Sequence, residues 1–269
     1  RQQHGPPART DQTQRLMLAA FPMYDRPETR DANDRLWALT RERLGYGPAE
    51  LTRAYDLDLW SLWESPDLLL TQTCGLPLRT RLAGKVDLVG SLINTLPGCP
   101  PGHYFSRIVV NKQASSDYLP DYAEARFAFN QSHSQSGWAA AQNHAAELGF
   151  RFTNATETGA HRMSARAVAE GRADIAVIDA VSWSMIDEYD DFARELKVIA
   201  NTIPTPGEPV IAAPGQDVAA LAEALSGAIA ALTPEDRTTL RLTGLVPADQ
   251  LSFADYAAIP NPPGPDMRA

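Results

Sequence analysis

The sequence predicts an α/β protein with two lobes, each built on a mainly parallel sheet flanked by helices. Short apolar runs of strand length alternate along the chain with segments of helical spacing, which is typical of this class. Two proline-rich loops, residues 97–102 and 202–209, each precede a strand-like apolar run. Such a pair of crossings would bracket an inserted lobe, and the two crossing strands would form a hinge. We expect a first lobe of residues 15–107 and 210–259, a second lobe of residues 108–209, and tails at residues 1–14 and 260–269.

The predicted strands are apolar runs of a few residues bounded by polar or turn-forming residues. Their length and their content of aliphatic and aromatic side chains favour strands over helices. They lie at residues 16–21, 67–71, 86–89, 107–110, 126–129, 150–153, 173–178, 197–200 and 210–213.

The predicted helices are recognised by apolar spacing and by the residues that begin or end them. Leu36 and Leu39 are spaced for one helix face, and Gly45 ends that helix. Asp217 and Thr233 are N-cap residues, and Thr233 is followed by proline and two acidic residues. The predicted helices cover residues 33–44, 136–148 and 161–170, and two more begin after Asp217 and Thr233.

The composition excludes several classes of protein. The chain has 269 residues, of which 44% are hydrophobic and 21% charged, so intrinsic disorder and fibrous repeats are excluded. The net charge of −9 disfavours a general nucleic-acid binder, which needs a basic surface. No run approaches the ~18 consecutive apolar residues that span a bilayer. No signal peptide is visible, and the start at Arg1 indicates a processed or recombinant end, which leaves export open.

Cys74 and Cys99 are the two cysteines of the chain. They cannot complete a four-thiolate zinc site, and we expect no metal and no cofactor. One disulfide would stabilise the fold by ~3–4 kcal/mol in the chain-entropy model. Two buried thiols are the alternative, and composition alone does not decide between them.

A run of small polar residues follows the predicted strand at 126–129 and precedes a predicted helix. It contains Ser132, Ser134 and Ser136, and then Gly137. The first N–H groups of a helix have no partners within the helix, and the helix dipole adds positive charge there. Amides and hydroxyls together would form a site for an anion without Lys or Arg, and Gly137 would let a ligand approach the backbone. The alternative is a plain N-cap in which one serine serves its own helix.

Polar residues at other predicted strand and helix ends extend this site. His161 begins a helix, where a neutral imidazole could donate to a ligand, although a solvated histidine is the alternative. Asp179 ends the strand at 173–178, where it would bind an amine or hydroxyl or cap the next helix at Ser182. In an enzyme, Cys74 would be a nucleophile served by His161, but no flanking signature of a thiol hydrolase is present.

The chain resembles the phosphate/phosphite/phosphonate-binding proteins of ABC importers, a periplasmic solute-binding family of the type 2 fold. The resemblance covers residues 16–258 approximately and depends on the order and spacing of several motifs. They are Gln72-Thr-Cys-Gly-Leu-Pro77, Gly98-Cys99 with Tyr104-Phe-Ser106, residues 130–137, Gly159-Ala-His161, and residues 167–179. The resemblance implies two α/β lobes joined by two crossing strands, with the ligand sealed in the cleft between them.

The resemblance also implies site residues. The family's Ser-Thr-Ser run corresponds to Ser134-Gln135-Ser136, with glutamine in place of threonine, and the family's histidine and hinge-side tyrosine correspond to His161 and Tyr104. A second family tyrosine has no match, since the chain there has Cys74-Gly-Leu76. An acidic residue that holds an amine in some members falls at Val181, so Asp179 would substitute for it. We add the polar residues Gln72 and Thr73 and the aromatic Tyr24, which are expected to face the cleft.

The function implied by the resemblance is the solute-binding component of an ABC importer. It would capture a small oxyanion-bearing ligand, a phosphonate or a related phosphorus compound, without catalysis. A sulfonate or nitrogenous metabolite on the same scaffold is one alternative, and the cysteine-dependent enzyme is another. The family implies a periplasmic or exported, membrane-associated location, a permease as partner, a monomer, no bound nucleic acid, and a disulfide between Cys74 and Cys99.

Overall fold

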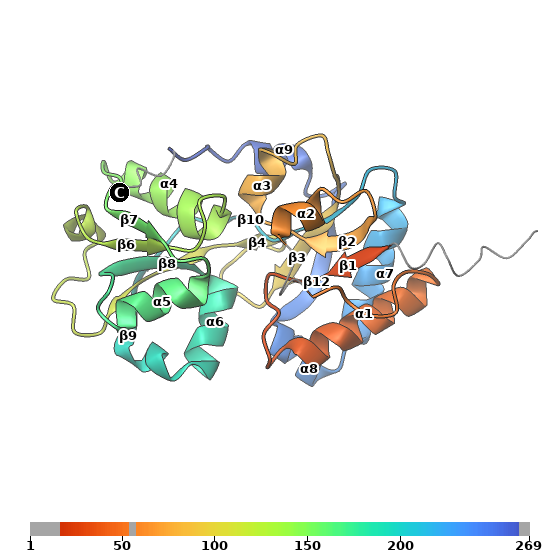
Figure 1. The fold of residues 1–269 in the computed structure, drawn as a ribbon, viewed down its shortest axis with the longest axis horizontal. Coiled ribbons are helices and arrows are strands. Elements are labelled where there is room, and N and C mark those ends of the chain that lie inside the picture. The colour runs from red at the N-terminus through yellow and green to blue at the C-terminus, as the bar shows by residue number, and fades with distance from the viewer. Residues whose placement is uncertain (1–16, 54–57, 264–269) are drawn as a thin grey trace, which may run out of the picture.

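The computed structural model describes residues 17–53 and 58–263 (Figure 1). Two five-stranded sheets lie side by side, each with helices on its faces, and a two-stranded ribbon lies between them. We call each sheet with its helices a lobe. The two-lobe α/β fold predicted from the sequence is confirmed. The predicted lobe boundaries stay a prediction, and residues 1–14 and 264–269 of the predicted tails lie outside the described residues.

The first lobe has the strand order β1-β2-β11-β3-β12. Helices α1, α7 and α8 cover one face of this sheet, where Trp37, Leu225 and Ile229 are fully buried, and α2, α3 and α9 lie over the other, around Trp63 and Tyr256. The strands are β1 (Leu18–Ala20), β2 (Leu68–Gln72), β3 (Asp87–Asn94), β11 (Pro209–Ala212) and β12 (Leu242–Pro247). The helices are α1 (Arg30–Leu44), α2 (Leu59–Trp63), α3 (Gly75–Arg79), α7 (Val218–Ala231), α8 (Pro234–Leu240) and α9 (Phe253–Ala257).

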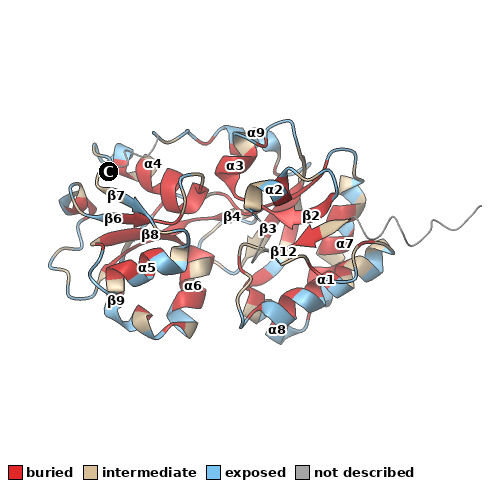
Figure 2. Cartoon of the chain, in the orientation of Figure 1, coloured by how far each residue is buried: buried red, intermediate tan, exposed pale blue. Residues whose placement is uncertain are grey.

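The second lobe has the strand order β7-β6-β8-β5-β9. One face carries a stack of aromatic rings that includes Phe127, Phe129, Trp138 and Phe152. The strands are β5 (Ser106–Asn111), β6 (Phe127–Phe129), β7 (Ala155–Glu157), β8 (Ile175–Asp179) and β9 (Leu196–Asn201). The helices are a π-helical turn at Gln135–Ala139 that continues into α4 (Ala140–Glu147), then α5 (His161–Ala169) and α6 (Ala180–Tyr189), with 3-10 turns at Leu119–Tyr122 and Asp191–Glu195. Figure 2 shows that the central strands of both sheets are buried, while the edge strand β7 and the outer helix faces are exposed.

The predicted crossings form the ribbon between the lobes. β4 (His103–Tyr104) pairs antiparallel with β10 (Thr205–Pro206), and the N–H of Gly207 donates to the carbonyl of Gly102 at 2.7 Å. Both proline-rich loops therefore lead into this ribbon, and each leads on into a strand of a five-stranded sheet.

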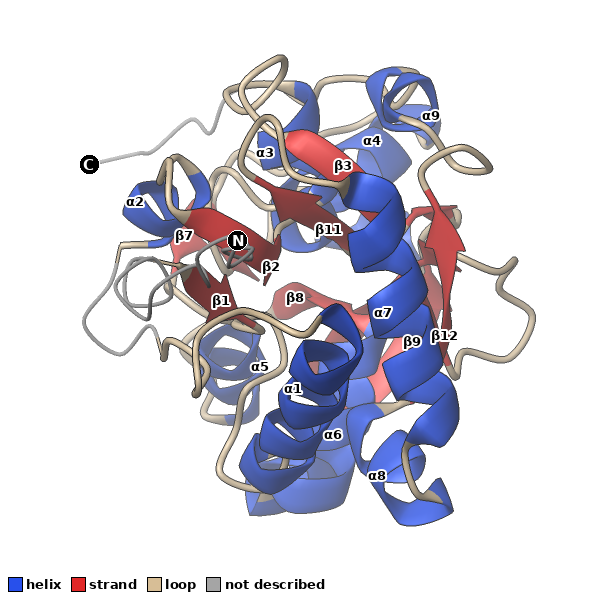
Figure 3. Cartoon of the chain, turned by 90° about the vertical axis from the view of Figure 1, so that its right-hand side faces the viewer, coloured by secondary structure: helices blue, strands red, loops and turns tan. Residues whose placement is uncertain are grey.

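The sheets are mixed, and the prediction that they are mainly parallel is wrong. The pairs β1/β2, β6/β7 and β6/β8 are parallel, but β5 runs antiparallel to β8 and β9, and β11 runs antiparallel to β2 and β3. The reason is that β5 and β11 begin at the ribbon, beside the other lobe, whereas β2, β6 and β8 end on that side (Figures 1 and 3).

Most predicted elements are present within a few residues of their predicted bounds. The strand predicted at residues 150–153 is absent, because the backbone N–H and C=O of Phe152 both pair with the side chain of Gln142, and the strand forms at β7 instead. The elements that were not predicted are the helices α2, α3, α6 and α9, the strands β4, β10 and β12, and the two 3-10 turns. Within residues 17–53 and 58–263, no single helix is long and apolar enough to cross a membrane; α7 and α8 pass that test only as a pair, which is bent by 116°.

Candidate functional site

A cavity of about 350 Å³ lies between the two lobes, beside the ends of β2, β6 and β8. Its volume is at the small end of the range for ligand pockets, which favours a small ligand. The first lobe contributes the loop at residues 22–26 and Trp63, Cys74 and Glu208. The second lobe contributes the remainder, which includes Asn130, His133, Ser134, Ser136, His161, Arg162, Asp179, Ser182 and Met185.

The serine run forms one wall of this cavity. Ser134 is the N-cap of the helical segment that begins at Gln135, and its Oγ accepts from the N–H of Gly137 at 3.0 Å. Ser136 Oγ lies 2.8 Å from Nε2 of His161, the first residue of α5. Ser134, Ser136 and His161 are therefore brought together from two helix ends, and their role in ligand binding stays a prediction.

Asn130 was not predicted as a site residue, although it ends the strand that leads into the serine run. Its Nδ2 lies 3.3 Å from Nε2 of His161, and its Oδ1 is buried without a hydrogen-bond partner among the described residues. A Cβ at Gly137 would lie 1.9 Å from Asn130 Oδ1, closer than any real contact. A side chain at position 137 would therefore collide with the Asn130 carboxamide. This is a second reason for glycine here, besides the close approach of a ligand to the backbone that the sequence suggested.

The first amides of the helical segment already have partners. The N–H of Gln135 donates to Cys74 Sγ at 3.2 Å, and that of Gly137 donates to Ser134. The Gln135 side chain is fully buried and does not line the cavity; its Oε1 accepts from Arg79 of the first lobe. The hydroxyls of Ser134 and Ser136 are therefore donors that this wall offers to a ligand besides the remaining amides of its first turn.

His161 is neutral at pH 7, because burial lowers the pKa of its imidazole, although nearby Asp179 opposes the shift. Its Nδ1 is buried without a hydrogen-bond partner among the described residues. With a proton on Nε2, the ring would donate to Ser136 Oγ and leave the serine hydroxyl free to donate into the cavity, provided that Asn130 turns its carboxamide oxygen, now without a partner, toward the ring in place of Nδ2.

Two buried carboxyl groups, Asp179 and Glu208, also line the cavity. Asp179 caps α6, since its oxygens accept from the N–H groups of Val181 and Ser182 at 3.0 Å, so the predicted capping role and the predicted cavity position are both observed. Glu208, in the link between β10 and β11, is 3% exposed, and its Oε2 has no partner among the described residues. Burial, with a further contribution from the charge of Asp179, raises the pKa of Glu208 well above its ordinary value. Glu208 was missed by sequence reasoning; the signal was a single acid in a proline-rich loop.

The other predicted site residues lie in or beside the cavity. Tyr24 lines it, and burial together with Asp179 and Glu208 raises the pKa of its phenol, so the group stays a donor. Tyr104 is buried with its hydroxyl 3.8 Å from Cys74 Sγ. Gln72 accepts the N–H of Met23 at 3.2 Å and so positions the loop before Tyr24, while the Thr73 hydroxyl is buried without a partner among the described residues.

The predicted disulfide is absent, because Cys74 and Cys99 are both free thiols. Cys74 follows β2 at the cavity and accepts from Gln135, whereas Cys99 lies half-buried in the loop before β4. Burial raises the pKa of Cys74 to about 11, so almost none of it is thiolate at pH 7. That is the opposite of an activated nucleophile, and it argues against the cysteine-dependent enzyme.

Comparison with known proteins identifies the family. Residues 96–256 match the model of the periplasmic substrate-binding proteins of ABC phosphonate transporters. The chain belongs to this family. The phosphonate-binding family consists of transport components, so the chain is a binding protein and not an enzyme. No curated protein matches the chain in sequence.

Solved structures show the same fold as this member of the phosphonate-binding family. PhnD1 from Prochlorococcus marinus, in complex with methylphosphonate, is 15% identical with a TM-score of 0.68, over 90% of this chain and 94% of that one. The binding protein component of an ABC phosphonate transporter from Pseudomonas aeruginosa is 15% identical with a TM-score of 0.66, over 87% and 82%. MatC from Rhodopseudomonas palustris, with bound malate, is 14% identical with a TM-score of 0.61, over 90% and 94%.

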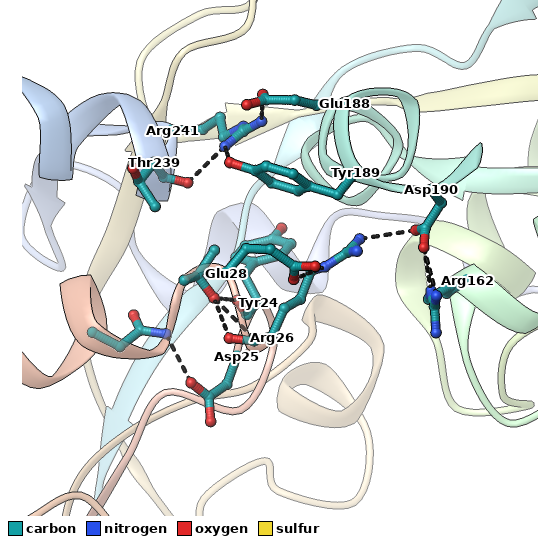
Figure 4. A network of polar contacts seen from close by, with 12 residues as sticks. Tyr24, Asp25, Arg26, Glu28, Arg162, Glu188, Tyr189, Asp190, Thr239 and Arg241 are labelled. Carbon is teal, nitrogen blue, oxygen red and sulfur yellow. Dashed lines mark hydrogen bonds and ion pairs between the residues drawn. The ribbon is translucent and has the colours of Figure 1, made fainter. Parts of the chain in front are cut away.

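In this phosphonate-binding family member, a polar network joins the lobes beside the cavity (Figure 4). Asp190 of the second lobe is 3% exposed and accepts from Arg26 of the first lobe at 3.1 Å and from Arg162 of its own lobe at 2.6 Å. The guanidinium carbons of Arg26 and Arg241 each lie 5.4 Å from the centre of the Tyr189 ring. Arg241 also donates to Glu188, so two arginines of the first lobe hold the end of α6.

Replacing Asp190 with asparagine is expected to lower the free energy of unfolding by about 1–3 kcal/mol, because two arginines lose a buried partner. The loss is smaller than for a fully buried pair, since the Arg162 side chain is 54% exposed. Urea unfolding measures the effect, and Asp191→Asn is the matched control because the Asp191 side chain is 97% exposed. Equal stability of the two variants would contradict the prediction.

The pH dependence of the Asp190 contribution follows from its pKa. Burial alone would raise this pKa, but hydrogen bonds from Arg162 and Arg26 outweigh it and hold the pKa below its ordinary value. A lowered folded-state pKa means that the stabilisation is complete above the unfolded-state pKa and is lost as the pH falls through the folded-state pKa. The difference between the two variants is therefore expected to shrink only in strong acid.

Proposed function

We propose that the chain is the periplasmic binding component of an ABC importer and that it captures a small phosphonate carrying an amino group. The observation that carries this proposal is the distribution of charge in one small buried cavity. The serine wall supplies neutral donors, and two buried carboxyl groups, Asp179 and Glu208, form an acidic wall. Arg26 and Arg162 also line the cavity, but both are paired with Asp190. A zwitterionic ligand satisfies both walls at once.

The serine wall would take the phosphonate group. The hydroxyls of Ser134 and Ser136 are 3% exposed and supply donors without a countercharge, with His161 neutral behind them. Hydrogen bonds to an ionised group are each worth ~1.5–3 kcal/mol, so hydroxyl donors suffice to bind an oxyanion in a chain of net charge −9. The methylphosphonate held by the related fold of PhnD1 supports this assignment.

The acidic wall of Asp179 and Glu208 would take the amino group. Asp179 already accepts three hydrogen bonds, from Val181 and from both donors of Ser182. Glu208 has an unpartnered oxygen, and its raised pKa favours the protonated form in the ligand-free cavity, whereas a ligand ammonium group would favour the carboxylate. A ligand that carries only an oxyanion leaves this wall without a partner.

The family relation supports the remaining parts of the proposal. The chain would work in the periplasm and present the closed, ligand-bound form to a membrane permease. A single chain contains both walls of the cavity, which supports a monomer as the working unit.

Isothermal titration calorimetry with a matched ligand panel tests the proposal. The panel contains an aminoalkylphosphonate, the alkylphosphonate of the same length, the aminoalkylsulfonate, an alkylamine, phosphate and phosphite. The aminoalkylphosphonate is expected to bind at least tenfold more tightly than each of the others. Tighter binding of the sulfonate or of the amine alone would select the alternative ligand classes. If nothing in the panel binds more tightly than about millimolar, the phosphonate proposal is wrong.

A further inference from the structure

We propose that residues 259–263, which we call the C-terminal strap, are a third connection between the lobes and hold them together in the absence of ligand. The strap follows α9, which packs on the first lobe through the fully buried Tyr256. It runs past α3 and reaches the second lobe at α4 (Figure 1). It therefore crosses the gap that the β4/β10 ribbon crosses elsewhere.

Two side chains of the second lobe bind the strap. Nδ2 of Asn143, on α4, donates to the carbonyl of Pro260 at 3.0 Å. Nε1 of Trp138, one turn earlier, donates to the carbonyl of Pro263 at 3.1 Å. Trp138 is 1% exposed, so its indole N–H would be left without a partner if the strap moved away.

Arg79, at the end of α3, ties the strap to the serine wall. It donates through Nη2 to the carbonyl of Pro260 at 3.1 Å and through Nε to Asn261 Oδ1 at 3.3 Å. Its remaining nitrogen, Nη1, donates to Oε1 of Gln135 at 2.5 Å. Gln135 lies between the two serines of the wall and is fully buried. One guanidinium thus joins the first lobe, the strap and the anion-binding turn of the second lobe.

The sequence of the strap suits this role. Proline at positions 260, 262 and 263 fixes φ and removes N–H groups that would need partners, so an extended segment presents mainly carbonyl acceptors. A stiff segment also loses less conformational entropy when it binds than a flexible one does. Asn261, which lies between these prolines, supplies the side chain that Arg79 contacts.

The consequence concerns the ligand-free protein. Opening the lobes about the ribbon must break the contacts of Arg79 with Gln135 or those of the strap with α4. Holding the lobes together before the ligand arrives removes part of the cost of closure and raises affinity. The strap inference concerns the ligand-free state, so it stands or fails independently of which ligand binds.

Small-angle X-ray scattering of the ligand-free protein tests the inference with two matched pairs. Arg79→Gln in the full chain is compared with Arg81→Gln, because Arg81 pairs with Glu64 within the first lobe. A chain that ends at Ile259 is compared with one that ends at Pro263. We expect Arg79→Gln and the shorter chain to increase the radius of gyration and the largest dimension, while both controls match the parent protein.

Circular dichroism establishes that each variant is folded, and Arg79→Gln keeps the test decisive if the shorter chain does not fold. The inference is overturned if Arg79→Gln scatters like Arg81→Gln, or if the folded chain ending at Ile259 scatters like the chain ending at Pro263. For any ligand that the parent protein binds, we expect the opened variants to show about tenfold weaker affinity.

Discussion

Replacing Ser134 and Ser136 together with alanine is expected to weaken phosphonate binding by about 2–4 kcal/mol, or roughly thirty- to several-hundred-fold. The two hydroxyls are donors that the serine wall offers to an oxyanion, whereas the nearby amides of Gln135 and Gly137 already have partners. Their loss would leave the anion in a buried cavity without replacement by water. Calorimetric titration with the aminoalkylphosphonate measures the loss directly.

Ser132→Ala is the matched control for this variant. Ser132 belongs to the same run, but it is exposed and only its backbone N–H is engaged, with Glu157. It is expected to bind like the parent protein. If the double variant also keeps the parent affinity, the oxyanion is bound elsewhere in the cavity.

The two serines are expected to differ when they are replaced singly. Ser134 is also an N-cap, so Ser134→Ala should lower the free energy of unfolding by about 1 kcal/mol in addition to its effect on binding. Ser136 bonds His161 and no backbone group of its own helix, so Ser136→Ala should affect binding with little change in stability. A thermal unfolding series separates the two contributions.

Local signals explain which elements could be predicted from the sequence. The caps Asp217 and Thr233 accept from the N–H groups of Ala220 and Asp236, three residues ahead, so both helices begin where the sequence indicated. The strand at 150–153 failed because Gln142, distant in sequence, takes both backbone groups of Phe152. The prediction of mainly parallel sheets failed for a similar reason. The directions of β5 and β11 are set by how the chain crosses between the lobes, and not by the residues within each strand.

The site residues also differ in whether a local sequence signal reveals them. Ser134, Ser136 and His161 carry their signals in adjacent residues, because each stands at the start of a helix. Glu208 acquires its role only from burial beside Asp179 and Tyr24, which lie far away in the sequence. The disulfide implied by family resemblance failed because Cys74 is placed against Gln135, where its thiol accepts an amide.

Glu208→Gln is expected to remove most of the preference for the amino group, about tenfold or more in affinity for the aminoalkylphosphonate, with little effect on the alkylphosphonate. In the parent protein, burial and the charge of Asp179 raise the pKa of Glu208, and the ligand ammonium would lower it, so binding should release a proton at a pH between these two pKa values. Titration in two phosphate-free buffers of different ionisation enthalpy counts that proton. The alkylphosphonate corrects for protons that the phosphonate group itself exchanges.

The sign of the pH dependence gives an independent check on Glu208. Its folded-state pKa is raised, so the stability that it contributes is complete below the unfolded-state pKa and is lost as the pH rises through the folded-state pKa. Besides Asp179 and Tyr24, the titratable groups that share its surroundings are Cys74, Tyr104 and Tyr256, all with pKa values raised by burial and hence neutral at pH 7. The ligand-free protein should therefore lose stability as the pH rises from mildly acid values, and Glu208→Gln should remove that slope. If Glu208→Gln changes neither the pH dependence of stability nor the proton release on binding, Glu208 is not the group that binds the ligand amine. The charge complementarity proposed for the cavity would then rest on Asp179 alone.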